Sequence, residues 1–145
     1  MARYVIAGRS TVVGTAARAI ASVFSPAGSG FRLVEVAIFN PTSTAVAAAL
    51  VRFTAATTVG TGLTEGEYDT DAAPPLATGF AGHTGDGTVG QVMDQADLGA
   101  AVGSGVIWTY GASGIVVPSG TANGIGVTCP TGTGQILTYR YTWDE

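Results

Sequence analysis

Four carboxylates alternate along one short stretch, at Glu65, Glu67, Asp69 and Asp71. Residues at every second position of an extended strand point to one face, so these four side chains would repel one another unless water or a cation lay between them. Calcium, which takes about six to eight oxygen ligands, would suit such a patch, but the spacing differs from the calcium loop of helix-loop-helix proteins. The same acids could supply a glycosidase pair, yet a sequence does not place two acids across a sugar. A solvated acidic loop is the favoured prediction, and these four residues are the candidate metal ligands.

Nucleophilic catalysis would depend on His83, the only histidine, because a serine nucleophile needs a base beside it. The sequence has no G-x-S-x-G turn and no lysine for a serine–lysine pair. We therefore expect His83 to be an exposed loop residue. The single cysteine, Cys129, forms no internal disulfide and is predicted to be a small buried apolar residue. The sequence predicts no catalytic residue and no enzyme.

The glycine pattern at 85–90 formally matches the dinucleotide-binding G-x-G-x-x-G. That motif requires a strand before it, a helix after it and an acidic residue about 20 positions further on. The preceding residues are loop-like, and no acid lies near the required distance. A chance match in a glycine-rich chain is the better interpretation, and no cofactor is predicted.

The aromatic residues follow strand spacing rather than a binding motif. Leu137, Tyr139, Tyr141 and Trp143 alternate with polar residues, which is typical of a half-buried strand. Together with Trp108 and Tyr110, these aromatics could form a platform for a sugar, but a core role is the more common one. Similar patterns predict strands at 3–9, 16–24, 31–40, 46–53, 106–110, 115–118, 125–128 and 135–143. A helix is the alternative for the alanine-rich segment 16–24.

We predict an all-β fold, a single antiparallel β-sandwich domain over residues 1–145, with residues 1–9 as an N-terminal strand or arm. A turn at Asn40-Pro-Thr-Ser-Thr44 joins segments 31–40 and 46–53 in a predicted hairpin. Segment 31–40 is apolar on both faces, which places it in the middle of a sheet. Residues 55–101 are rich in Gly and Thr and are predicted to form a long loop region or insertion. Such loops are uncommon in compact domains, so at least one strand is expected there, at Thr88–Met93.

Charge is scarce in this chain of 145 residues, which has six basic residues, all arginine, and ten acidic ones. A monomer with so little charge would risk self-association, so either sister subunits cover the surface or codon bias explains the composition. The net charge of −4 and the scattered arginines argue against nucleic acid. No apolar stretch approaches the ~20 residues that span a membrane. The start lacks the apolar segment of a signal peptide, so we expect synthesis in the cytoplasm without export.

Several segments of the sequence resemble small virion proteins of tailed bacteriophages. These segments are Val34–Val46, Ala49–Thr54, Thr58–Glu65, Ile115–Gly120, Asn123–Val127 and Tyr141–Glu145. They cover about two thirds of the chain, and the likeness lies in their order and spacing rather than in any single motif. The region from Thr64 to Ala101 shows no such resemblance.

The resemblance implies a sandwich of jelly-roll type, often trimeric, that attaches to the outside of a capsid or forms part of a tail. Capsid decoration suits the length of the chain best, with the major capsid protein as partner and the capsid exterior as location. The N-terminal strand is the expected interface, with Arg3, Tyr4, Val5 and Arg9 lying across a neighbouring subunit. A tail or baseplate component and a carbohydrate-binding module are the alternatives.

Overall fold

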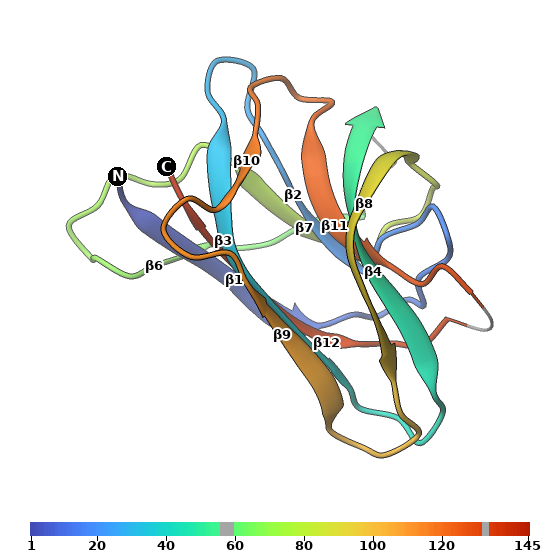
Figure 1. Cartoon of the computed structure of the whole chain (residues 1–145). Coiled ribbons are helices and arrows are strands. Elements are labelled where there is room, and N and C mark those ends of the chain that lie inside the picture. Colours follow the sequence, from blue (N-terminus) through green and yellow to red (C-terminus); the bar gives the residue numbers. More distant parts are fainter. Residues whose placement is uncertain (56–59, 132–133) are drawn as a thin grey trace.

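The protein is an all-β molecule of two antiparallel six-stranded sheets, and Figure 1 shows them packed face to face. The computed structural model describes residues 1–55, 60–131 and 134–145. Sheet A has the strand order β10-β3-β12-β1-β6, and β9 also pairs with β3. Its strands are β1 (Arg3–Arg9), β3 (Phe31–Asn40), β6 (Gly66–Glu67), β9 (Ser104–Thr109), β10 (Ile115–Val117) and β12 (Thr138–Asp144). The predicted all-β class and two-sheet arrangement are confirmed.

Sheet B has the strand order β5-β7-β2-β11-β4-β8. Its strands are β2 (Ala21–Phe24), β4 (Val46–Ala55), β5 (Thr61–Gly62), β7 (Thr78–Ala81), β8 (Thr88–Leu98) and β11 (Gly124–Thr128). No described residue belongs to a helix, so the helical alternative for 16–24 is wrong. The predicted strand there is too long, because only its last four residues form β2. No helix in the described part of the chain is long and apolar enough to cross a membrane.

The core between the sheets is built on the strand at the C-terminal end of the chain. Tyr139, Tyr141 and Trp143 of β12 are at most 3% exposed, and all point into the core. The Tyr141 hydroxyl donates to the Ala21 carbonyl at 2.8 Å and accepts from the Val127 amide at 2.9 Å. A buried hydroxyl is costly without such partners, so these two bonds tie β12 of sheet A to β2 and β11 of sheet B. The predicted alternation of this strand is confirmed.

Strand β3 contains a β-bulge that changes which residues face the core. Its pairing with β12 shifts between Thr142 and Trp143, leaving Val34 as the extra residue. Phe31 and Leu33 before the bulge and Val36 and Ile38 after it are therefore all buried in the core. The sequence pattern, read without a bulge, placed these pairs on opposite faces. The predicted central position of the strand is confirmed, because β3 lies between β12 and the pair β9 and β10.

The predicted hairpin of 31–40 with 46–53 is wrong, because β3 belongs to sheet A and β4 to sheet B. The turn between them instead carries the chain from one sheet to the other. The side chain of Asn40, which is fully buried, donates to the Thr44 and Gly99 carbonyls and accepts from the Thr42 amide. These bonds hold the turn in place. Strand β4, which lies between β11 and β8, is apolar on both faces because one face packs in the core and the other in a second apolar cluster.

The predicted long loop of residues 55–101 is also wrong, because it contains β5, β6, β7 and β8. The strand expected at Thr88–Met93 is confirmed as the first part of β8, which continues to Leu98 and is the longest strand among the described residues. Glycine and threonine hid its pattern, and its pairing with β4 shifts register three times, which breaks any simple alternation. Residues 56–59, which include Thr58 and Val59 of one resembling segment, lie outside the described residues.

A second apolar cluster covers the outer face of sheet B. Its buried members are Ala19, Phe24, Ala49, Val51 and Phe53, and Phe80 and Val89 pack against them. The rings of Phe24 and Phe53 stack at 6.0 Å, and Phe80 meets Phe24 edge-on at 6.2 Å. Sheet B is thus apolar on both faces.

Candidate interaction surface

The outer face of sheet A presents an uncovered apolar surface. Strand alternation directs Ala7 of β1, Ala37 and Phe39 of β3 and Ile107 of β9 outward, opposite the core residues. Ile107 is 53% exposed and Phe39 is 37% exposed. The ring of Phe39 lies over Gly105 of β9, where any Cβ would overlap it.

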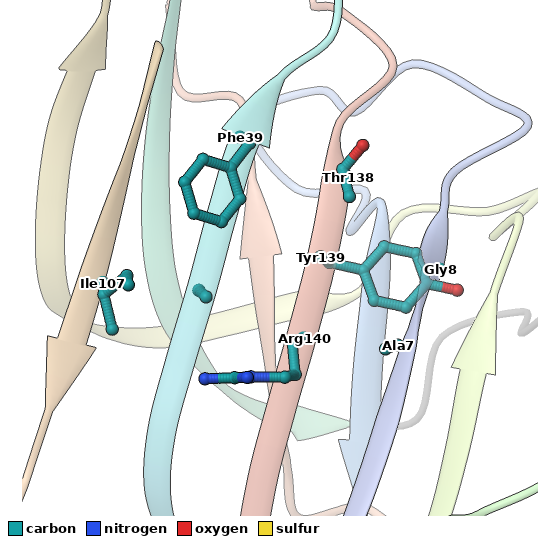
Figure 2. A pocket seen from close by; sticks show the side chains of 8 residues that line it. Ala7, Gly8, Phe39, Ile107, Thr138, Tyr139 and Arg140 are labelled. Atoms are coloured by element: carbon teal, nitrogen blue, oxygen red, sulfur yellow. The ribbon is translucent and has the colours of Figure 1, made fainter. Parts of the chain in front are cut away.

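A shallow hollow of about 300 Å³ occupies this face (Figure 2). Figure 2 shows Phe39 and Ile107 on one side of the hollow and Tyr139 beside Gly8 on the other, with Arg140 below them. On the core side of the same strands, Gly8 leaves room for the Tyr139 hydroxyl, which would lie 2.9 Å from a Cβ at that position. Arg140 is the one charged residue among the described residues of the lining, and it is paired with Glu35. The hollow therefore suits packing against a partner surface better than holding a charged ligand.

Ion pairs within the chain satisfy most of the charge on this face. Arg3 donates two hydrogen bonds to the Asp144 carboxylate, at 2.7 and 2.9 Å, and Arg140 pairs with Glu35. The hydrogen bonding of Arg3 to the Asp144 carboxylate is the main cause that raises the pKa of Arg3. Exposed pairs of this kind contribute about 0–1 kcal/mol each. These pairs mainly neutralise the charged groups on this face and add little to the stability of the fold.

The four residues expected at an N-terminal interface lie in the chain's own sheet. Strand β1 pairs along its whole length with β12, so it is no free arm. Tyr4 is buried, and its hydroxyl donates to the Ala73 carbonyl at 2.6 Å. Arg3, Val5 and Arg9 point to the outer face. The interface role of this strand stays a prediction. Only its outward side chains and the edge that does not pair with β12 are free for such a contact.

The prediction that His83 is an exposed loop residue is wrong, because its ring is fully buried. Nε2 lies 2.8 Å from Oγ of Ser22, which is also fully buried, so the fold does assemble a serine–histidine pair. Burial lowers the pKa of His83 to about 4. Nδ1 has no hydrogen-bond partner among the described residues, so no carboxylate there orients the ring. A substrate carbonyl cannot reach a buried Oγ, and the pair acts in packing.

The four alternating carboxylates do not converge. Only Glu67 lies in a strand, and Glu65 accepts a hydrogen bond from the Gly79 amide at 2.8 Å. Asp69 accepts one from the Asp71 amide at 3.1 Å, which forms a local turn. No group of three or more possible metal ligands occurs among the described residues. The one-face arrangement required an extended segment, and the chain turns here instead.

The aromatic residues divide between the core and one side of the sandwich. Tyr139, Tyr141 and Trp143 are buried, so they form no sugar platform. Trp108 and Tyr110 are half-buried against the core, and the Tyr110 hydroxyl donates to Asp94 of β8 at 2.6 Å. That bond joins the edge of one sheet to the edge of the other.

Two further motifs have structural explanations. Residues 85–90 lead into strand β8 rather than a helix, so the dinucleotide interpretation fails. Cys129 is 2% exposed, as predicted, and burial raises the pKa of its thiol. A thiol that resists ionisation is a poor nucleophile.

No family model, curated protein or solved structure matches the chain.

Proposed function

We propose that this protein is a non-enzymatic virion protein of a tailed bacteriophage that binds the outer surface of the capsid as an oligomer and stabilises it. The two-sheet sandwich, which we expect to be of jelly-roll topology, serves as a rigid scaffold for docking surfaces. Its partners are sister subunits, in a trimer, and the major capsid protein.

The observation that carries the proposal is the outer face of sheet A. It combines the exposed side chains of Phe39 and Ile107 with alanines and internally paired charges. Soluble monomers seldom leave such a surface uncovered, and one rimmed by polar residues is typical of protein–protein contact. Several such contacts on a symmetric shell add up to strong attachment even where each is weak.

The test is to mix the purified protein with capsids that lack it and to sediment the capsids. We expect saturable binding and capsids that open at a higher temperature. Fractions from disrupted phage particles provide the second arm, in which the protein should follow the heads. Recovery with the tails would favour the tail or baseplate alternative, and absence from both fractions would reject a virion role.

A further inference from the structure

Strand β1 has an open edge at its C-terminal end. Backbone bonds between Ala2 and Glu145 and from Ser10 to Leu137 show that the even-numbered residues of this segment pair with β12. The backbone groups of Ala7 and Arg9 therefore point away from β12. Strand β6 reaches only Tyr4 and Val5 on that side. Both backbone groups of Ala7 and of Arg9 thus lack a strand partner among the described residues.

Strand β8 has one edge that no described strand pairs with. It pairs with β4 on one side, and no described strand forms hydrogen bonds to its other side. Between Asp94 and Leu98 the pairing with β4 is regular, so this part presents a straight edge. An edge of this kind is a template for a strand from another chain.

The two open edges carry opposite charges. Strand β1 contains two arginines and no acid, and β8 contains two aspartates and no base. Arg3 and Asp94 already have partners within the chain. The side chains of Arg9 and Asp97 are both exposed, and neither side chain forms a hydrogen bond or ion pair with a described residue.

The two edges lie on opposite sides of the sandwich, as Figure 1 shows. Ile6 of β1 contacts Gly79 of β7, so β1 lies over the β5–β7 side of sheet B. Strand β8 forms the other side of that sheet. Two copies therefore cannot pair through both of their edges at once. Contacts between the β1 edge of one copy and the β8 edge of another instead join copies head to tail.

We propose that the open edge of β8 in one copy pairs with Ala7–Arg9 of β1 in a second copy, with Arg9 and Asp97 forming an ion pair across the junction. Backbone hydrogen bonds supply the contact, as in other strand additions. The Asp97 side chain faces outward, since Ala96 and Leu98 on either side of it pack on the core. The Arg9 side chain faces outward because it alternates with the buried residues of β1. A closed ring then needs three or more copies. The inference rests on the oligomer in the proposed function and needs no capsid.

The test is charge reversal followed by mass measurement with light scattering over a range of concentrations. Arg9→Glu and Asp97→Arg should each raise the concentration for half-assembly by about ten-fold, because like charges then face each other in every junction of the ring. The double variant should restore assembly. Arg32→Glu and Asp71→Arg, which change charge away from both edges, are the matched controls and should assemble like the wild type.

A cross-linking experiment covers the case in which a reversal disturbs folding. Arg9→Cys and Asp97→Cys chains, mixed under oxidation, should give a disulfide-linked pair that neither chain gives alone, and Cys129 is too buried to interfere. A wild type that is monomeric at every concentration would overturn the proposal. Asp97 would then be a charge that prevents β8 from pairing with other strands. Assembly unaffected by either reversal, or no restoration in the double variant, would also overturn it. Assembly without capsid binding would reject the proposed function alone.

Discussion

The outer faces of the two sheets both carry large apolar side chains, but these are buried on sheet B and exposed on sheet A. On sheet B, Phe24 and Phe53 stack on each other and are at most 6% exposed. On sheet A, Phe39 and Ile107 also point outward, but each leaves more than a third of its surface in water. The difference lies in what covers them, since Ala19 and the buried His83–Ser22 pair add cover to sheet B.

The comparison separates apolar residues that stabilise the fold from those that remain for a partner. A covered aromatic stabilises the folded state through the area it removes from water, at about 25 cal/mol per Å². An exposed one contributes that free energy only when another surface covers it. Sheet B should therefore dominate the stability of the chain, and the outer face of sheet A should dominate its binding.

The sharpest test of the difference is to remove one phenylalanine from each face. Phe53→Ala should lower the free energy of unfolding by about 3–5 kcal/mol, because it leaves a cavity among buried side chains. Phe39→Ala, the matched control, should cost less, about 1–2 kcal/mol, because more than a third of the side chain is already in water. Urea unfolding of both variants measures the two values. Equal losses would contradict the assignment of the faces.

The buried His83 should make the cover of sheet B sensitive to acid. Its pKa is about 4 in the folded protein, below the ordinary value of 6.5, so the unfolded chain binds the proton more readily. Stability from this group is complete above pH 6.5 and is lost as the pH falls to about 4, by up to about 3 kcal/mol.

The measurement is the free energy of unfolding across that pH range. His83→Gln, which cannot ionise, should flatten the decline relative to the wild type. Parallel curves for the two proteins would show that His83 is already protonated or exposed in the fold.

Glycine packing offers a third, smaller test. A Cβ at Gly124 would lie 2.5 Å from the ring of Phe24, so Gly124→Ala should cost about 1–3 kcal/mol by forcing the aromatic cluster apart. Gly28→Ala is the matched control, because nothing lies within 4 Å of its Cβ position. We expect the control to change stability by less than about 1 kcal/mol. The measurement compares the melting temperatures of both variants with that of the wild type. An unchanged melting temperature for Gly124→Ala would mean that the cluster is loosely packed.

The sequence predicted best where one strand faces the core with strict alternation. Segment 135–143 behaved this way, and its buried residues Tyr139, Tyr141 and Trp143 are those expected. Segments 31–40 and 46–53 were correctly predicted as strands but wrongly paired, because apolar residues on both faces do not show which sheet a strand joins. The turn at Asn40 looked like a hairpin turn, and only the buried contact with Gly99 reveals its true role.

The candidate surface was less predictable because it depends on tertiary contacts. Ala37 and Phe39 share a face in the sequence pattern, but the bulge in β3 decides that this face is the outer one. His83 gave no sign of burial, since its neighbours in sequence are polar and glycine-rich. Strand β8 was predicted only as far as Met93, because three register shifts and Gly90 obscure its period.

The central claim is that the uncovered face of sheet A binds the capsid, and Ile107→Glu tests it most directly. The side chain is 53% exposed, so the substitution should lower the free energy of unfolding by only about 1 kcal/mol. Leu76→Glu, in an exposed position outside this face, is the matched control. Sedimentation with capsids that lack the protein should show binding by the wild type and by Leu76→Glu, and at least about ten-fold weaker binding by Ile107→Glu. Equal binding by all three proteins would contradict the account.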